Sequence, residues 1–504
     1  MHELVIGEQR LHVADVNRVA RGELPVRLSD DARFRARLQR GADVIAERIE
    51  RNLPTYGVNT GYGASVRNAI PASAALTLAR NLPRYHGCGV GPDLSYEESR
   101  AVMLVRVNSL AAGYSGVRPV LLERLIALLE RGVAPIIPAR GSVGASGDLT
   151  PLSYVAALVV GERRAWLRGE QMTASAALAA AGIEPLPLFA KESMAIMNGT
   201  SVMSALACLA AERAANLARL ASALTALAID AVAGQHSHFD PRLFTAKAHP
   251  GQAESASVIR SYLGERAPGA PQPKRIQERY SLRCAPHVIG VLLDTLPFCH
   301  GVLENEINGA SDNPLIDPES GDVLHGGNFY GGHMAMVADT LKTLVANLAD
   351  LMDRQLLLLN EPNVSGLPEN LVAFTGSERF AHHGFKAMEI TASALTAEAL
   401  KLSVPASVFS RSTEGHNQDK VSMGLLAVQD LQRIIELTEA VGAVHAIAGA
   451  QAIELRGVEH TSVALRELHA QLRERTRFMV EDRPLDSDIE AVRALIQDGW
   501  PSRC

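Results

Sequence analysis

Three segments of the 504-residue chain carry apolar residues at helical spacing over more than about 25 residues each, and they constrain the fold more than any other feature. They cover residues 198–234, 331–361 and 419–456. Helical patterns of this length without internal breakers are typical of a bundle of parallel and antiparallel rods. We therefore predict a mainly α-helical fold. In it, residues 191–504 form a long-helix bundle as one intertwined unit, and residues 1–190 form a small mixed N-terminal region.

The start of the chain predicts two smaller elements. Two short apolar runs, residues 4–6 and 11–13, flank a glycine and predict a small hairpin. Residues 29–51 have the pattern of an amphipathic helix, with Ser29 or Asp30 as its N-terminal cap.

Charge and composition limit the partners. The net charge is −6 at pH 7, with both signs mixed along the chain, which argues against nucleic acid or an anionic membrane. The N-terminus lacks the apolar core of a signal peptide, and we expect charges to interrupt every apolar stretch before it can span a bilayer. The five cysteines form no CxxC pair and the histidines no HExxH spacing. We expect a cytoplasmic protein with reduced thiols and no metal site.

One short segment can become a cofactor by itself. Residues 141–154 read GSVGASGDLTPLSY. The amide nitrogen of Gly147 can attack the carbonyl carbon of Ala145 and close a five-membered ring, because glycine tolerates the bent backbone that this needs. Loss of the Ala145 oxygen as one water and of the Ser146 hydroxyl as a second water then leaves a methylidene-imidazolone, a strong electrophile that no ordinary side chain provides.

The residues after this triplet predict a helix. Pro151 falls in its first turn, and Asp148 or Thr150 lies near its cap. The positive end of the helix dipole would then lie near the ring.

The run 141–154 closely resembles the signature of the histidine, phenylalanine and tyrosine ammonia-lyases and the related aminomutases. The resemblance covers about residues 50–460 of this chain. It implies the helical ammonia-lyase/fumarase-like fold and a homotetramer with active sites shared between subunits. It also implies a 4-methylidene-imidazole-5-one formed from Ala145, Ser146 and Gly147, with no external cofactor.

The resemblance gives roles to two further motifs. In the glycine-rich loop TYGVNTGYG, which can close over a substrate as a lid, Tyr56 occupies the place of the candidate base for the β-proton. A phenol is a weak base at neutral pH, so Tyr56 needs a depressed pKa in the closed site. In KESMAIMNGT, Asn198 occupies the place of the asparagine that lies beside the electrophile at a helix start and helps to hold the substrate. We expect Lys191 and Glu192 to be structural.

The stretch RIQERYSLRCAPHVIG places Tyr280 and Arg283 on one helical face through their i, i+3 spacing. The planar fork of an arginine binds both oxygens of a carboxylate. Similarity to the family pattern QDxYSLRCxPQ makes Arg283 the expected ligand of the α-carboxylate, Tyr280 a second catalytic phenol and Gln277 a substrate contact. The chain departs from that pattern at Glu278 and His287.

Three more residues are expected at the substrate. Phe329 in HGGNFYGG occupies the place of an aromatic ring stacked near the imidazolone, and Asn313 in SDNPLID is expected to support the site from behind. In SRSTEGHNQDKVSMG, Asn417 and Gln418 are expected substrate contacts. Aligned on VSMG, histidine lyases usually have a glutamate where this chain has Gln418. A neutral amide cannot serve an imidazole as a carboxylate would, which argues against histidine as substrate.

The pair that faces the substrate ring in the family is Tyr85 and His86 here. A donor at this place can bond a phenolic hydroxyl, and a site built to bond a hydroxyl strongly rejects a substrate that lacks it. The pair therefore favours tyrosine.

The resulting hypothesis is a carbon–nitrogen lyase that eliminates ammonia from the aromatic amino acid L-tyrosine to give trans-4-coumarate. The same residues would serve a tyrosine 2,3-aminomutase, which returns ammonia to the β-carbon, or a phenylalanine or histidine ammonia-lyase. A different class is a non-enzymatic helical scaffold built from the same rods, and an intermediate case forms the ring but turns over nothing.

Overall fold

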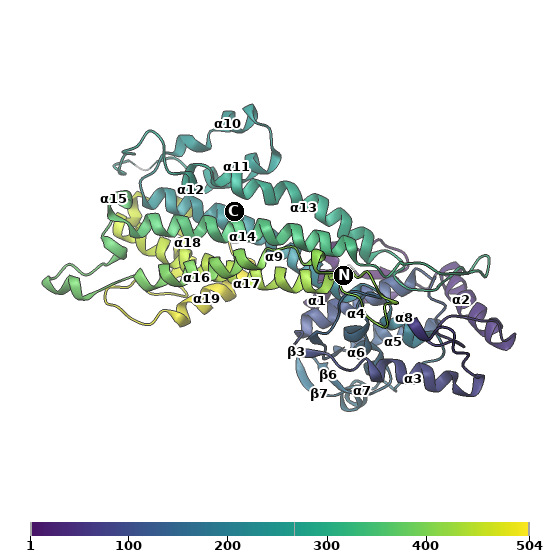
Figure 1. The fold of residues 1–504 in the computed structure, drawn as a ribbon. Coiled ribbons are helices and arrows are strands. Elements are labelled where there is room, and N and C mark those ends of the chain that lie inside the picture. Colours follow the sequence, from purple (N-terminus) through teal and green to yellow (C-terminus); the bar gives the residue numbers. More distant parts are fainter. Residues whose placement is uncertain (1–2, 267, 502–504) are drawn as a thin grey trace. The chain divides into compact units, whose positions relative to one another are not determined.

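The computed structural model describes residues 3–266 and 268–501 and is predominantly helical, as predicted (Figure 1). The chain divides into two compact units, each assembled from three separate stretches. Residues 1–190 all fall in the first unit, whereas residues 191–504 are divided between the two. Unit 1 is Met1–Glu212, His300–Asp339 and Pro405–Gln429, and unit 2 is Arg213–Cys299, Thr340–Val404 and Asp430–Cys504.

Unit 1 combines short helices with four small sheets. The pairs are β1 with β2 (parallel), β3 with β5, β4 with β6 and β7, and β8 with β9 (all antiparallel). Helix α4 is buried along almost its whole length and is the centre of this core. The elements are β1 (Leu4–Ile6), α1 (Val13–Ala20), β2 (Val26–Leu28), α2 (Ala32–Glu50), α3 (Ala75–Tyr85), β3 (Val90–Asp93), α4 (Tyr96–Ala111), α5 (Pro119–Glu130), β4 (Val133–Pro135), β5 (Pro138–Arg140), α6 (Leu149–Val159), β6 (Arg164–Leu167), β7 (Glu170–Thr173), α7 (Ala174–Ala181), α8 (Glu192–Met197), β8 (Leu315–Ile316) and β9 (Val323–Leu324).

The regular elements of the described part of unit 2 are all helices, joined by loops. Its shorter helices are α10 (Pro241–Ala246), α11 (Pro250–Leu263), α12 (Tyr280–Arg283), α15 (Pro362–Ser365), α16 (Lys386–Leu402), α18 (Val463–Arg473) and α19 (Asp486–Gln497). Seven 3₁₀ turns are also described in the chain, namely Gly63–Ser65, Ala72–Ala74, His236–Phe239, Glu369–Leu371, Ser377–Ala381, Ala406–Phe409 and Val458–His460.

Four long helices have segments in both units: α9 (Ser201–Ala231), α13 (Ala285–Ile307), α14 (Gly332–Asn360) and α17 (Gly424–Arg456). The three predicted long segments correspond to α9, α14 and α17. Within unit 2 they lie side by side, since a Cβ on Gly442 would overlap Leu220 and Gln355 Nε2 donates to Thr225 Oγ1 at 2.9 Å. Small residues at such contacts let the rods approach closely, as the alanine content predicts.

Two N-terminal predictions were wrong in detail. The expected hairpin does not form, because residues 13–20 are helix α1 and β1 pairs in parallel with β2. Buried Val13, Val16 and Val19 follow a helical spacing rather than the alternation of a strand. The predicted helix 29–51 is α2, but its cap is Asp31, which accepts from the N–H of Phe34 at 2.8 Å.

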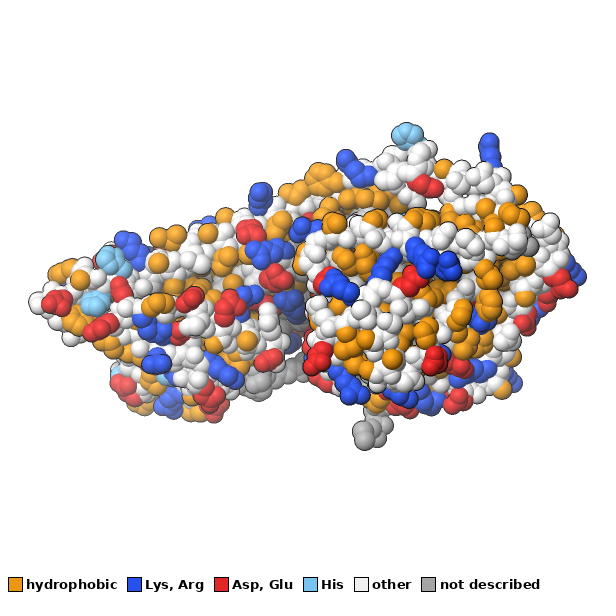
Figure 2. All heavy atoms as spheres, turned by 90° about the horizontal axis from the view of Figure 1, so that it is seen from below, with side chains coloured by type: hydrophobic (Ala, Val, Ile, Leu, Met, Phe, Trp, Pro, Cys, Tyr) orange, Lys and Arg blue, Asp and Glu red, His pale blue; other side chains and the backbone are white. Residues whose placement is uncertain are grey.

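The surface is mixed in charge. Acidic and basic side chains are interspersed with apolar ones on the face that Figure 2 shows. One helical segment, Tyr280–Ile307, is long and apolar enough to cross a membrane by length and composition. Asp294 nevertheless interrupts its apolar run, as expected, and helices inside large cores can be equally apolar. Its residues Val291 and Phe298 are exposed in the single chain.

The described cysteines, Cys88, Cys208, Cys284 and Cys299, are all unpaired. Cys504 lies outside the described residues.

Candidate active site

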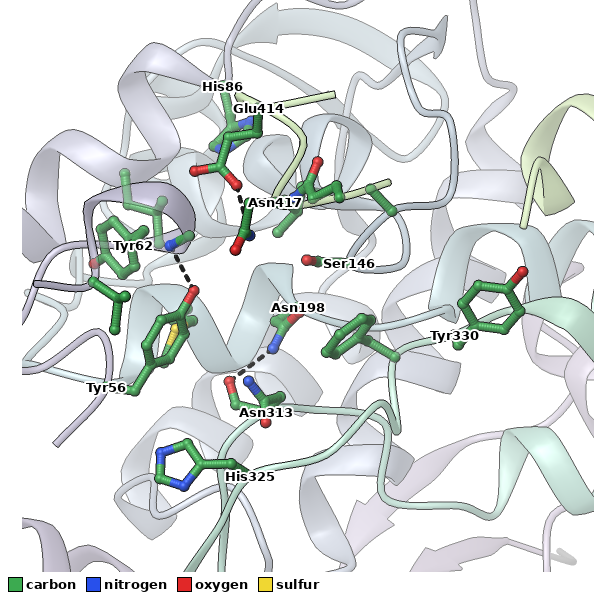
Figure 3. Close-up of a pocket in the computed structure, with 18 of the residues that line it drawn as sticks. Tyr56, Tyr62, His86, Ser146, Asn198, Asn313, His325, Tyr330, Glu414 and Asn417 are labelled. Atoms are coloured by element: carbon green, nitrogen blue, oxygen red, sulfur yellow. Dashed lines mark hydrogen bonds between the residues drawn. The ribbon is translucent and has the colours of Figure 1, made fainter. Parts of the chain in front are cut away.

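A cavity of about 590 Å³ in unit 1 brings together segments that are far apart in the sequence (Figure 3). These are the lid loop (residues 54–66), the end of α3, the electrophile loop (residues 141–148), the turn after α8, the segment 313–330 and the segment 413–420. The lining residues are Tyr56, Tyr62, Gly63, Val66, Leu82, Tyr85, His86, Ala145, Ser146, Leu149, Met194, Asn198, Asn313, His325, Phe329, Tyr330, Glu414, Asn417, Gln418, Asp419 and Lys420.

The electrophile loop is held in place from two sides. On one side, the N–H of Asp148 donates to the carbonyl of Gly199 at 2.7 Å. On the other, the N–H of Met423 donates to the carbonyl of Val143 at 3.0 Å, and the Ser422 hydroxyl donates to the carbonyl of Gly144 at 3.2 Å. The loop is therefore a fixed structure against the cavity rather than a free turn.

The backbone of this loop fits the ring closure that the sequence predicts. Gly144 and Gly147 have φ of +70° and +69°, a region that residues with a side chain rarely adopt. A Cβ on Gly147 would also overlap the backbone of Gly199. Ala145 and Ser146 line the cavity, so a methylidene-imidazolone formed here would face it.

Asp148 has a different role from the predicted one. Helix α6 begins at Leu149 with Pro151 in its first turn, as expected, but the Asp148 carboxylate does not cap it. It is buried and accepts from the N–H groups of Val202 and Met203, at 3.0 and 2.8 Å, at the start of α9. Burial raises the pKa of Asp148 to about 7, against the effect of these two hydrogen bonds. Asp148 thus joins the electrophile loop to the long helix.

The lid loop reaches over the cavity through Tyr56, whose phenol oxygen accepts from the N–H of Gly63 at 2.8 Å. Gly63 has φ of +52°, and a Cβ there would overlap the carboxylate of Glu414. The expected depressed pKa of Tyr56 is not found. Burial raises its pKa, and the hydrogen bond from Gly63 opposes this only in part.

Asn198 lies in the turn between α8 and α9, three residues before the long helix, and does not cap it. Its Nδ2 donates to Asp312 Oδ1 at 3.1 Å and to the carbonyl of Asn313 at 2.9 Å. Asp312 in turn pairs with the buried Lys191, with Nζ 2.6 Å from Oδ2. Asn313, expected behind the site, itself lines the cavity (Figure 3).

The end of α3 presents Tyr85 and His86, whose ring centroids are 4.6 Å apart. Arg163 holds this helix end: one guanidinium nitrogen donates to the carbonyl of Pro83, and another donates to Ser153 Oγ at 3.0 Å. Burial and the charge of Arg163 lower the pKa of His86, and burial raises that of Tyr85 to about 12. Both side chains are therefore neutral at pH 7 and can donate or accept a hydrogen bond.

The segment 413–420 contributes a carboxylate that the sequence analysis missed. Glu414 Oε1 accepts from the N–H of Ala64 at 2.9 Å, and Oε2 accepts from Asn417 Nδ2 at 3.0 Å (Figure 3). Gln418 Oε1 accepts from Thr413 Oγ1 at 2.7 Å, so Gln418 keeps its amide hydrogens for other partners. A carboxylate side chain, that of Glu414, therefore lines the cavity even though residue 418 is an amide.

Four predicted site residues are not among the residues that line this cavity: Gly147, which directly follows Ser146 in the electrophile loop, and Gln277, Tyr280 and Arg283. Gln277, Tyr280 and Arg283 belong to unit 2, and none is among the described residues around the cavity. Tyr280 is 72 % exposed. Arg283 Nε donates to the carbonyl of Glu278 at 3.0 Å, and its guanidinium lies 4.7 Å from the Tyr280 ring centroid. Tyr280 and Arg283 thus share one helical face, as the i, i+3 spacing predicts.

Comparison with known proteins now decides the family. The model of the aromatic amino acid lyases matches residues 11–474. The chain belongs to the aromatic amino acid lyase family. It is a carbon–nitrogen lyase, in a family that also includes aminomutases.

Relatives that are named for different activities match this lyase over almost its whole length. The histidine ammonia-lyase of Anaeromyxobacter sp. (strain K) is 38 % identical over 99 % of both chains. The tyrosine aminomutase structure from Streptomyces globisporus is 34 % identical with a TM-score of 0.91, covering 99 % of this chain and 97 % of that one. The histidine ammonia-lyase structure from Trypanosoma cruzi is 31 % identical with a TM-score of 0.88, covering 99 % and 94 %.

The lyase cavity is also lined by residues to which the sequence analysis gave no role. Besides Glu414, these include Tyr62, His325, Tyr330 and Lys420. Tyr62, Tyr330 and Lys420 lie within the motifs TYGVNTGYG, HGGNFYGG and SRSTEGHNQDKVSMG, and the structure shows that they line the cavity. His325 directly follows strand β9 and is the first residue of the motif HGGNFYGG.

Proposed function

We propose that this lyase eliminates ammonia from L-tyrosine to give trans-4-coumarate. The observation that carries this proposal is that Tyr85 and His86 line the same cavity as Ala145 and Ser146. A neutral His86 offers a hydrogen bond to a phenolic hydroxyl, which a phenylalanine substrate lacks. The cavity is also within the size range of small-molecule sites.

Each part of the proposed elimination is assigned to particular residues of the chain. The methylidene-imidazolone formed from Ala145, Ser146 and Gly147 would supply an electrophile that turns the substrate amine into a leaving group. Tyr56, as the phenolate, receives the β-proton at its phenol oxygen and becomes a neutral phenol, and the N–H of Gly63 stabilises the phenolate before this transfer. Phe329 lies on the cavity wall, where its ring can stack on the substrate. Asn198 faces the substrate amine.

The substrate carboxylate needs a cation, and we propose that Arg283 of the partner subunit provides it, with Tyr280 and Gln277 beside it. The arrangement would be a cytoplasmic homotetramer with shared active sites and no nucleic-acid or membrane partner. Two observations support sharing. Tyr280 is exposed in the single chain, and so are the apolar side chains of Val291 and Phe298 on α13. Lys420, which lines the cavity, is the alternative cation within the same chain.

Histidine is the second candidate substrate. Glu414 places a carboxylate in the cavity, which weakens the argument from Gln418 against an imidazole. The name of the Anaeromyxobacter relative points the same way. A tyrosine 2,3-aminomutase would use the same residues, as the name of the Streptomyces globisporus structure suggests.

One experiment separates these candidates. Purified protein is incubated in turn with L-tyrosine, L-phenylalanine and L-histidine, and the products are identified by mass and chromatography. Release of ammonia with trans-4-coumarate supports the proposal. Accumulation of β-tyrosine would identify an aminomutase, turnover of histidine alone would identify the second candidate, and no product from any of the three would refute lyase activity on aromatic amino acids.

A further inference from the structure

We propose that the buried ion pair Lys191–Asp312 is a positioning device that fixes the amide of Asn198 so that its oxygen, and not its nitrogen, faces the substrate amine. The inference rests on the proposed function, since it requires an amino acid in the cavity. It gives Lys191, expected to be merely structural, a role in recognising the substrate through two other residues.

The contacts form a chain from Lys191 to the cavity. Lys191 and Asp312 are completely buried side chains, with Nζ 2.6 Å from Oδ2. Asp312 Oδ1 accepts from Asn198 Nδ2 at 3.1 Å and from the N–H of Asn313 at 2.7 Å. The carbonyl of Asn313 accepts from the same Asn198 nitrogen at 2.9 Å. Asn198 itself lines the cavity.

The charges decide which way the Asn198 amide points. Its two neighbours on the protein side, a carboxylate oxygen and a carbonyl oxygen, can only accept, so the NH₂ group must face them. The flipped amide would place its own oxygen against these two oxygens, so that the Asn313 carbonyl would lose this donor and Asp312 Oδ1 would keep the N–H of Asn313 but lose the amide. The Asn198 oxygen is therefore the atom that remains for a ligand. It can accept a charge-assisted hydrogen bond from a substrate ammonium group but cannot bind a carboxylate.

Lys191 stabilises the ionised form of the Asp312 carboxylate. A buried carboxylate without a counter-charge is costly, and Lys191 supplies that charge on the side of Asp312 away from Asn198. Lys191 adopts φ of +76° directly before α8, an unusual conformation for a residue with a side chain. The Arg106 guanidinium is a second cation near Asp312, and it donates to the carbonyl of Ser311 at 3.0 Å.

The first test measures ligand binding without chemistry. In Ser146→Ala protein, which cannot form the electrophile, calorimetry gives the Kd of L-tyrosine and of its amine-free product trans-4-coumarate. Adding Asp312→Asn should weaken L-tyrosine by about tenfold or more and leave trans-4-coumarate within about twofold. The reason is that the new amide has one oxygen and one NH₂ group, whereas Lys191 and Asn198 are both donors. Either orientation of the new amide therefore sets its NH₂ group against one of these two donors.

The second test is suppression by a second substitution. Adding Lys191→Met to Asp312→Asn removes one of the two conflicting donors, so the new amide can turn its oxygen to Asn198 and its nitrogen away. The double variant should bind L-tyrosine more tightly than Asp312→Asn alone. In an Asn198→Ala background, Asp312→Asn should have no further effect on the Kd. A purely structural role would give additive losses in both comparisons.

Glu192→Gln is the matched control. Glu192 adjoins Lys191 and is itself buried in an ion pair with the partly exposed Arg118 at 2.8 Å, but among the described contacts it has no hydrogen bond or ion pair with Asn198 or Asp312, and it does not line the cavity. It should lower Tm without changing either Kd.

Equal weakening of L-tyrosine and trans-4-coumarate by Asp312→Asn, or additivity in the Asn198→Ala background, would overturn the inference while leaving the proposed function intact. If the wild-type protein turns over a different aromatic amino acid, that amino acid and its product replace the probes. Binding of no aromatic amino acid to the wild-type protein would overturn the proposed function, and with it this inference.

Discussion

The phenol oxygen of Tyr56 accepts a 2.8 Å hydrogen bond from the backbone N–H of Gly63 across the lid loop. Burial raises the pKa of this phenol and the charge of Glu414 raises it further, while the hydrogen bond from Gly63 favours the phenolate. Tyr56 is therefore protonated at pH 7 in the single chain. Lowering its pKa enough for base chemistry requires additional positive charge, which Arg283 of the partner subunit would bring.

Replacement of Tyr56 tests its role as the base. Tyr56→Phe removes the proton acceptor and should lower kcat by about 100-fold or more, with a small change in KM. Steady-state kinetics on the identified substrate provide the measurement. Tyr96→Phe is the control, because the Tyr96 hydroxyl donates to the carbonyl of Gly132 and accepts from Arg100, and Tyr96 does not line the cavity. A kcat within tenfold of wild type for Tyr56→Phe would exclude this phenol as the base.

Ser146→Ala tests formation of the electrophile. Intact-mass measurement of the wild-type protein should show the loss of two waters relative to the sequence, and the variant should show none and be inactive. The buried Ser204, whose hydroxyl donates to the carbonyl of Thr200 at 2.8 Å, gives the control Ser204→Ala, in which the mass loss should persist. A wild-type mass equal to that of the unmodified chain would rule out the cofactor.

His86→Phe tests the substrate. Loss of the hydrogen-bonding imidazole should reduce the ratio of kcat/KM for tyrosine over phenylalanine by about tenfold or more. Competition between the two amino acids in one reaction measures the ratio directly. Unchanged turnover of tyrosine in this variant would count against a phenolic substrate.

Complementation tests whether active sites are shared. Ser146→Ala and Arg283→Ala should each be inactive, but co-expressed chains should recover activity, up to about a quarter of wild type if subunits mix at random. Arg275→Ala, in the same segment as Arg283, should retain activity by itself. If mixed protein forms tetramers by light scattering and yet has no activity, Arg283 acts within its own subunit or not at all.

His445 makes stability depend on pH. It is fully buried in α17, neither ring nitrogen has a partner among the described residues, and burial lowers its pKa to about 3. Since an unfolded histidine has a pKa of about 6.5, the unfolded state binds the extra proton between these values. The free energy of unfolding should therefore fall as the pH falls from about 6.5 towards 3.

His445→Leu should flatten this dependence, by at most about 1.4 kcal/mol per pH unit. Urea unfolding at about pH 5 and about pH 7 gives the two free energies. The exposed His249, replaced by Gln, is the control and should leave the slope unchanged. An equal slope in His445→Leu and wild type would show that His445 is hydrated or protonated in the folded protein.

Much of the architecture was predictable because it depends on local pattern. The long helices α9, α14 and α17 follow from alanine- and leucine-rich runs, and Pro151 marks the first turn of α6. The N-terminal hairpin was wrong because two short apolar runs fit a strand as well as part of a helix, and only burial of Val16 and Val19 decides between them.

The site was predictable in its reacting triplet and in the residues that motifs mark, since Tyr56, Asn198, His86, Phe329, Asn417 and Gln418 all line one cavity with Ala145 and Ser146. Glu414 and His325 were missed because nothing local distinguishes them from loop residues. The elevated pKa of Tyr56 was also beyond reach, since it reflects burial by segments distant in the sequence.

The sequence by itself determined the chemistry that the triplet can undergo, because ring closure depends on the covalent order of Ala145, Ser146 and Gly147. It also determined the helical class, because periodicity is a local property of the chain. Only the tertiary structure decided which groups meet: that Asp148 holds the start of α9 rather than of α6, that Lys191 and Asp312 orient Asn198, and that Arg283 lies in a different unit from the cavity. Such relationships depend on how distant segments pack, and no local pattern records them.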